Sequence, residues 1–458
     1  MILIKLIYSL LIIFIAGKLL LDMKFFDVSD EHPWVRIPLY FFSGTTVISI
    51  YMFILSLLNI HFRIWIISMP FLIYAAFLIF RNKNWRLDPR FLMPDIRAYK
   101  FSWPDILIGL LAIMCASMLI NSIIVPVFAK DAFSIWFFKA KIFFTERTVP
   151  FNILTSDIFE YSHSDYPFLI SLNLAWISLC LGQWKDTVLR IFFTLQYALF
   201  IPLFYFWIRK YISRQNAAIA SFVLFSNSHI LEYASNGYAD FILGIFAAVS
   251  IIFLVKWLDS HEKRHLYLSS FFIGSSVFIK NDGASLFLAI LILLAGYLIN
   301  SYKNKRISIN DAAFDLCSFL GISLAIFMPF KTAVLLQAIP NHMIKNINIF
   351  ATMAENLNRF PVIAGYFLYE LYLDTYVWQY FWIFLTLLLI IGRKRVFGAN
   401  IRFILYFFFI SLSFYFFVYM LTVLPLAYHL EASFHRLLIG LAPAAAFLAF
   451  SSGLMEET

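Results

Sequence analysis

Five short clusters of carboxylates and cations interrupt an otherwise apolar sequence. The first cluster holds Asp131 and continues with aromatic residues that alternate with Lys139 and Lys141. The other four contain Asp165 with Tyr166, Asp240, Lys280 with Asp282, and Arg436. Ionisable groups at membrane depth are costly and tend to mark function. Carboxylates and cations brought together would form a site that binds an anion and removes the proton of a hydroxyl.

Each cluster also has a purely structural explanation. An aspartate at a helix end, such as Asp165 or Asp282, commonly caps the helix, and Asn281-Asp282-Gly283 is an ordinary turn sequence. Lys139 and Lys141 are suited to reaching the lipid headgroups. The histidines lack metal-ligand spacing, so we predict no metal site. The concurrence of five clusters is what favours a functional site.

The elements that must position these clusters are membrane-spanning helices. Apolar residues make up 62% of the 458 residues and charged residues only 13%, about half the charged share of a soluble domain. The apolar residues come in runs of roughly twenty, the length that a helix needs to cross the hydrocarbon core. We therefore predict an all-α membrane protein with about 13 transmembrane helices and a first long external loop that carries interfacial helices. The predicted spans are 2–21, 37–58, 64–80, 105–125, 187–208, 215–234, 240–258, 266–280, 284–300, 312–330, 376–391, 402–422 and 437–452.

The positions of Lys and Arg predict which side each loop faces. Nineteen of the thirty-five Lys and Arg residues fall in five short loops, and the positive-inside rule places such loops in the cytoplasm. The loops are 81–104, 209–214, 256–265, 302–306 and 393–402. The net charge of +9 then reflects loop orientation, and we predict no nucleic-acid partner. With this orientation, all five clusters fall on the outer side. Alternation of the spans also places the N-terminus outside, whereas Lys5 favours a cytoplasmic N-terminus. One of the first three apolar runs is therefore a candidate re-entrant segment.

In their order along the chain, the clusters resemble the motifs of the C-type superfamily of polytopic glycosyltransferases. That superfamily includes protein O-mannosyltransferases and the aminoarabinose transferase of lipid A. Asp131-Ala132, followed by Trp136 and Lys139, resembles its acidic motif in the first long external loop. The later matches are Ser164-Asp165-Tyr166-Pro167, Gly237-Tyr238-Ala239-Asp240, Lys280-Asn281-Asp282-Gly283 and the Arg436-bearing segment 430–437. The sequence departs from the superfamily at Asp282, where Glu is common, and at Phe434-His435, where many members have Leu-Asp.

The resemblance, which covers about residues 105–452, implies an enzyme of the bacterial inner (plasma) membrane with its active site on the outer side. Such an enzyme moves a sugar, with inversion, from a polyprenyl-phosphate donor to an acceptor hydroxyl. Asp131 would be the general base, and Arg436 would stabilise the leaving lipid phosphate. The further substrate-binding residues would be Asp165, Tyr166, Asp240, Lys139, Lys141, Lys280 and Asp282. The expected partners are the lipid-linked donor, an envelope glycan, lipid or protein acceptor, and membrane lipid. No cofactor is predicted, although members of the superfamily differ in their use of a divalent ion.

The predicted organisation has four segments. N-terminal membrane helices occupy 1–104, and the glycosyltransferase membrane core occupies 105–330, with its external loop at 126–165. A second external loop follows at 331–375, and C-terminal membrane helices fill 376–458.

Two other classes of function stay open as alternatives. An O-antigen polymerase or ligase also uses lipid-linked glycans outside, but relies on Arg and His in one large late loop. The Lys, Arg and His residues of the loop at 331–375 are only Lys331, His342, Lys345 and Arg359. A transporter or flippase of lipid-linked substrates should carry ionisable groups near the midplane of its spans and often internal repeats. Here the charges crowd the outer ends of the spans and no repeat is visible, which disfavours that class.

Overall fold

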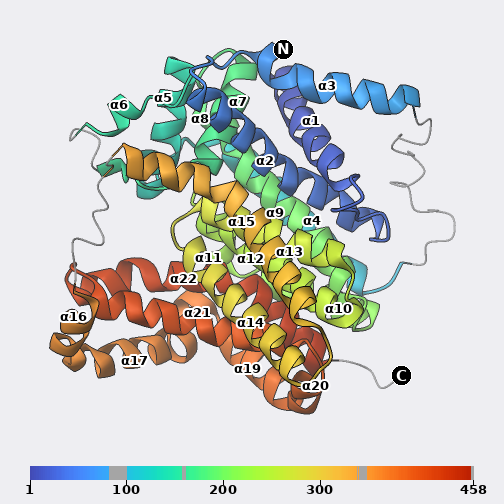
Figure 1. The fold of residues 1–458 in the computed structure, drawn as a ribbon, viewed down its shortest axis with the longest axis vertical. Coiled ribbons are helices and arrows are strands. Elements are labelled where there is room, and N and C mark those ends of the chain that lie inside the picture. Colours follow the sequence, from blue (N-terminus) through green and yellow to red (C-terminus); the bar gives the residue numbers. More distant parts are fainter. Residues whose placement is uncertain (82–100, 157–160, 338, 340–347, 455–458) are drawn as a thin grey trace. The chain divides into compact units, whose positions relative to one another are not determined.

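The computed structural model describes residues 1–81, 101–156, 161–337, 339 and 348–454, and every regular element in these residues is a helix (Figure 1). Within these residues, ten helical segments are long and apolar enough to cross a membrane. They are Ile2–Leu21, Pro33–Leu57, Ile64–Arg81, Pro104–Ile124, Asp186–Ile208, Asp240–Ser260, Gly283–Lys303, Ile309–Leu336, Arg402–Leu421 and Leu426–Gly453. The prediction of an all-α polytopic membrane protein is confirmed.

Three of the thirteen predicted spans correspond to shorter helices. The predicted span 215–234 is two helices, α10 (Arg214–Phe225) and α11 (Ser228–Ser235). The break lies at Asn227, whose side-chain oxygen accepts hydrogen bonds from the backbone of residues 229 and 230 and so starts the second helix. The predicted span 266–280 is α13 (Lys263–Ile279), with 17 residues, and 376–391 contains α19 (Phe381–Ile391), with 11 residues. The count of thirteen is therefore not confirmed.

Parts of three predicted loops lie outside the described residues. Residues 82–100 make up most of the predicted cytoplasmic loop at 81–104. Residues 157–160 belong to the first predicted external loop, and 340–347, which include His342 and Lys345, belong to the second.

The chain divides into two compact units. Unit 1 comprises Met1–Ser156, Phe168–Phe222 and Ala234–Tyr238, and unit 2 comprises Asp157–Pro167, Val223–Tyr233 and Ala239–Thr458. The helices of unit 1 are α1 (Ile2–Leu21), α2 (Pro33–Leu57), α3 (Ile64–Arg81), α4 (Pro104–Ile124), the π-helix η2 (Ala132–Phe137), α5 (Phe138–Glu146), α6 (Phe151–Leu154), α7 (Leu169–Leu181), α8 (Asp186–Leu189), α9 (Ile191–Ile208) and most of α10.

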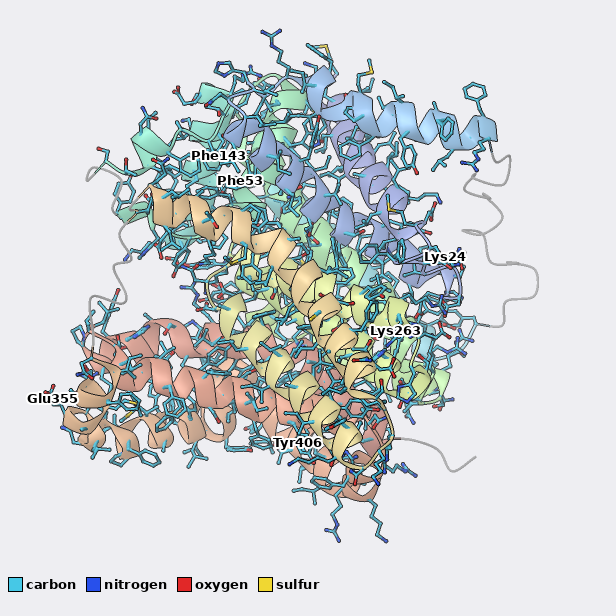
Figure 2. The ribbon with its side chains drawn as sticks, in the orientation of Figure 1. Lys24, Phe53, Phe143, Lys263, Glu355 and Tyr406 are labelled. Carbon is cyan, nitrogen blue, oxygen red and sulfur yellow. The ribbon has the colours of Figure 1, made fainter. Side chains whose placement is uncertain are left out.

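Unit 1 is organised around α7, a short helix in which every residue is buried. Its Asn173 donates hydrogen bonds to the Thr45 carbonyl oxygen at 3.0 Å and to the Ser49 hydroxyl at 2.7 Å. These bonds join α7 to α2, because a polar side chain in an apolar interior is stable only when it is hydrogen-bonded. Phe53 of α2 and Phe143 of α5, both labelled in Figure 2, pack against the Phe168 ring just before α7. The apolar run at 168–182, too short to cross a membrane, is thus a core element of unit 1.

Unit 2 contains most of α11 and all later helices. They are α12 (Asp240–Ser260), α13, α14 (Gly283–Lys303), α15 (Ile309–Leu336), α16 (Ile349–Glu355), η4 (Leu357–Arg359), α17 (Phe360–Leu368), η5 (Tyr369–Leu373), α18 (Thr375–Trp378), α19, α20 (Arg393–Gly398), α21 (Arg402–Leu421) and α22 (Leu426–Gly453).

The centre of unit 2 is α12, which packs against α13 and α22 and is buried along nearly its whole length. Small polar residues join the neighbouring helices, as is typical of contacts between membrane helices. Ser250 of α12 donates to the Ser269 carbonyl oxygen of α13 at 2.7 Å, and Ser270 of α13 lies 2.9 Å from the Ser323 hydroxyl of α15. These contacts join α12, α13 and α15 near the middle of their lengths, and the candidate site lies beyond them, toward one end of these helices.

Candidate functional site

An ion-pair network lies within unit 2, where the ends of three helices meet. Asp240 is the first residue of α12, and its side chain is only 2% exposed. One carboxylate oxygen accepts a hydrogen bond from Lys280 Nζ at 2.8 Å, and the other accepts one from Arg436 Nη2 at 3.2 Å. Lys280 directly follows α13 and Arg436 belongs to α22. A buried carboxylate therefore fixes two cations that are far apart in the sequence.

Asp282 extends this network on its more exposed side. It occupies the N-cap position of α14, yet its side chain makes no capping hydrogen bond. Its carboxylate lies 2.6 Å from Lys280 Nζ and is 31% exposed. The capping explanation for Asp282 is therefore wrong in this structure, because the carboxylate is engaged by Lys280 instead.

Asp165 takes part in a second branch of the network. One of its carboxylate oxygens accepts a hydrogen bond from Asn281 Nδ2 at 3.0 Å, and Asn281 Oδ1 accepts one from Lys331 Nζ at 2.7 Å. The other oxygen, Asp165 Oδ1, is buried without a hydrogen-bond partner among the residues that the structure describes. Asn281 lies between Lys280 and Asp282 in the sequence, so the two branches meet at the turn before α14.

The network contains the carboxylates of Asp165, Asp240 and Asp282 and the cations Lys280, Lys331 and Arg436. Burial by itself lowers the pKa of Lys280, but Asp240 and Asp282 outweigh burial and raise that pKa above its ordinary value. The raised pKa keeps Lys280 protonated between the two carboxylates. Burial also raises the pKa of the Tyr166 hydroxyl, which keeps it neutral and able to donate a hydrogen bond.

The remaining predicted site residues, Asp131, Lys139 and Lys141, belong to unit 1. Asp131 is half-buried at the N-cap position of η2. Lys139 is 0% exposed, with its ammonium 5.7 Å from the centre of the Phe168 ring, whereas Lys141 is exposed. Two residues separated by two positions lie on opposite faces of a helix. Lys139 and Lys141 therefore lie in different environments, and Lys139 is not the exposed side chain that contact with lipid headgroups requires.

Arg190 fixes the chain that leads to Asp131, and the sequence did not suggest this. Its buried guanidinium donates to the carbonyl oxygens of Val125 at 2.6 Å and Ser235 at 3.1 Å, and to Asn121 Oδ1 at 3.0 Å. Asn121 and Val125 end α4, and Ser235 ends α11. The carbonyl oxygens at a helix end carry partial negative charge, so helix termini stabilise this cation. Asp131 follows Val125 by six residues.

Gly237 packs directly against the π-helix that follows Asp131. A Cβ atom at position 237 would lie 2.9 Å from Ala132 Cβ and 3.0 Å from Phe137 Cε2, and its φ is +95°. Both the space and the backbone conformation therefore require glycine. This is a physical reason for the glycine in the sequence Gly237-Tyr238-Ala239-Asp240.

We expect Arg190→Gln to lower the free energy of unfolding by roughly 2–5 kcal/mol, because buried carbonyl groups lose a charged donor. Thermal unfolding of the detergent-solubilised protein, followed by tryptophan fluorescence, would measure the loss. Lys185→Gln removes a nearby exposed charge and should leave the melting temperature almost unchanged. Equal melting temperatures for the two variants would contradict the stabilising role of Arg190.

Two members of the network, Asn281 and Lys331, were not predicted as site residues. Asn281 stood inside the Lys280-Asn281-Asp282-Gly283 motif, so its position was available as a signal. Lys331 was visible only as a lone cation in the long apolar helix α15, and a charge within a membrane helix commonly marks a functional site. Among the residues that the structure describes, no group of three or more His, Cys, Asp or Glu side chains could hold a metal ion.

Comparison with protein families gives a match that begins at Asp165. Residues 165–333 match the family described as dolichyl-phosphate-mannose-protein mannosyltransferase. The matched segment includes Asp165, Asp240, Lys280, Asp282 and Lys331 of the network, and also Tyr166. The resemblance to C-type glycosyltransferases is thereby confirmed. The curated proteins and the solved structures gave no match.

Proposed function

We propose that this membrane glycosyltransferase of the polyprenyl-phosphate-sugar type moves a sugar from such a donor to an acceptor hydroxyl on the extracytoplasmic side of the membrane. The observation that carries the proposal is the convergence of Arg436 and Lys280 on Asp240. The departing lipid phosphate is an anion, and preorganised cations stabilise the charge that develops on it. Since Asp240 already holds both cations in place, little reorganisation is needed when the phosphate departs.

In the proposed reaction, the Asp131 carboxylate takes the proton of the acceptor hydroxyl. The acceptor oxygen forms a bond to the anomeric carbon from the face opposite the leaving group, which inverts the configuration. The bond between the anomeric carbon and the phosphate oxygen breaks, and its electron pair leaves with the lipid phosphate. Arg436 and Lys280 stabilise that phosphate by charge-assisted hydrogen bonds. Lys280 supplies charge only, because its pKa is raised.

The other predicted residues have supporting roles in the proposal. Asp165 and Tyr166 position hydroxyl groups of the sugar or acceptor, and the unpartnered oxygen of Asp165 suits a hydroxyl donor. Asp240 and Asp282 orient the cations. Lys139 stabilises unit 1 from its buried position beside Phe168, and Lys141 is placed to contact lipid headgroups. No metal is included in the reaction.

We also propose that the protein lies in a bacterial inner membrane, with the site on the periplasmic face and an envelope glycan, lipid or protein as acceptor. The positive-inside distribution of Lys and Arg supports this orientation. The network residues lie at helix ends or in the turns between helices, except for Lys331 and Arg436. An enzyme acting at the membrane surface fits this placement better than a transporter with a midplane site.

The decisive experiment compares donor classes with purified protein. Membranes that lack this protein would supply the acceptor, and the donor would be either a radiolabelled polyprenyl-phosphate sugar or the corresponding nucleotide sugar. We expect label to enter the acceptor fraction only from the lipid-linked donor, because that donor reaches the site from within the bilayer. Direct and equal use of the nucleotide sugar would contradict the proposal.

A further inference from the structure

A groove in unit 2 has apolar walls and one basic end. It lies between α19, α21 and α22 and has a volume of about 400 Å³. Its walls include Leu389, Phe408, Ala445 and Leu448, and Arg393 lines one end. Within the described part of the chain, this groove is separate from the network around Asp240, since the two share no residue.

The groove runs along α19, from Trp382 near the start of that helix to Arg393 just beyond its end. Eleven residues of helix rise by about 16 Å, which is about half of the ~30 Å hydrocarbon thickness. An apolar groove of that length matches one leaflet of the bilayer. The Arg393 end then lies at the depth of the headgroups.

The segment from Arg393 to Arg402 carries charges of only one sign. Arg393, Lys394, Arg395 and Arg402 lie within ten residues, and no Asp or Glu occurs between residues 375 and 430. Arg393 and Lys394 are exposed, and neither side chain has an ion-pair partner within the ranges that the structure describes. A zwitterionic headgroup carries an ammonium group for which this segment offers no carboxylate. A headgroup with net negative charge is complementary to it.

We propose that this groove binds an anionic glycerophospholipid, with one acyl chain along α19 and its phosphate on Arg393. The apolar walls of the groove bury the acyl chain, and this contact is hydrophobic and non-directional. The arginine fork forms charge-assisted hydrogen bonds with the phosphate oxygens. The positive-inside distribution places this lipid in the cytoplasmic leaflet. This lipid site is independent of the proposed sugar transfer, because no residue is common to both.

Native mass spectrometry of the purified full-length protein tests the site. The probes are phosphatidylglycerol, phosphatidylethanolamine with the same acyl chains, and the water-soluble headgroup glycerophosphoglycerol. We expect phosphatidylglycerol to bind more tightly than phosphatidylethanolamine, and the headgroup alone not to bind. Arg393→Gln should weaken phosphatidylglycerol binding about fivefold, the effect of one basic residue near an anionic lipid. Ala445→Phe should weaken it as well, by filling the apolar part of the groove.

Lys303→Gln is the matched control, because Lys303 is an exposed basic residue outside the groove. It should leave phosphatidylglycerol binding unchanged. Equal binding of the two phospholipids, or equal behaviour of Arg393→Gln and Lys303→Gln, would overturn the proposal. Binding of the soluble headgroup as tight as that of the phospholipid would also overturn it, since the groove would then contribute nothing. Arg393 is exposed, so its substitution leaves the packing intact and keeps the test decisive even if Ala445→Phe does not fold.

Discussion

Asp131→Asn should reduce sugar transfer by ~100- to 10,000-fold, the range that general-base catalysis commonly supplies. Asn has nearly the same shape as Asp and keeps one acceptor oxygen, so the helix start at η2 should survive. Only the negative charge that accepts the proton is lost. The measurement is transfer from a polyprenyl-phosphate sugar to acceptor membranes at matched protein levels.

Two further measurements separate catalysis by Asp131 from structure. Glu146→Gln changes an exposed carboxylate at the end of α5 and should leave the transfer rate close to wild type. Asp131→Asn should also retain the wild-type melting temperature and the wild-type affinity for the lipid-linked donor. If it keeps more than about a tenth of the wild-type rate, Asp131 is not the base, and Asp165 or Asp240 becomes the candidate.

Arg436→Ala should lower kcat/KM for the lipid-linked donor by an amount that corresponds to about 2–4 kcal/mol of transition-state stabilisation. Arg436→Lys should be less impaired, because lysine keeps the charge and loses only the bidentate fork. The measurement is donor-dependent transfer, compared at equal amounts of folded protein.

The ion pair with Asp240 makes a stability control necessary for the Arg436 variants. Removal of Arg436 takes one of two cations from a buried carboxylate, which destabilises a fold, although the 2.8 Å contact with Lys280 stays. Thermal unfolding of each variant would therefore accompany the kinetics. Arg359→Ala is a suitable comparison, since Arg359 also belongs to unit 2 and donates to the Thr422 carbonyl oxygen. Equal and unimpaired transfer in Arg436→Ala and Arg436→Lys would remove Arg436 from the donor site.

The roles of Asp131 and Arg436 complement each other in these experiments. Loss of the Asp131 carboxylate should slow sugar transfer at saturating donor. Loss of the Arg436 guanidinium should lower kcat/KM for the lipid-linked donor. Substitution of Arg393 in the groove should weaken phospholipid binding without either of these changes in sugar transfer. The three sets of variants therefore report on different parts of the molecule.

The membrane class of this protein follows from its amino-acid sequence. An apolar run of roughly twenty residues can form all its backbone hydrogen bonds within the bilayer only as a helix. Long spans such as Ile2–Leu21 and Asp240–Ser260 were therefore predictable from the length of the apolar runs. The acidic and basic motifs could likewise be found, because charges are rare in such a sequence. Shorter segments were less predictable. The break at Asn227 within an apolar stretch depends on one local side-chain contact, which hydropathy does not register.

Which charged side chains contact one another depends on how the helices pack. Asp240 pairs with Arg436 across 196 positions, and Asp165 pairs with Asn281 across 116. Sequence spacing cannot supply such pairings, because they depend on how α12, α13, α14 and α22 pack. The burial of individual side chains could not be predicted from the sequence either. Lys139 is buried inside unit 1, whereas Lys141, two residues later, is exposed. The physical reason is that hydropathy is a local property of the chain, whereas the environment of a charge is set by helices that are distant in sequence.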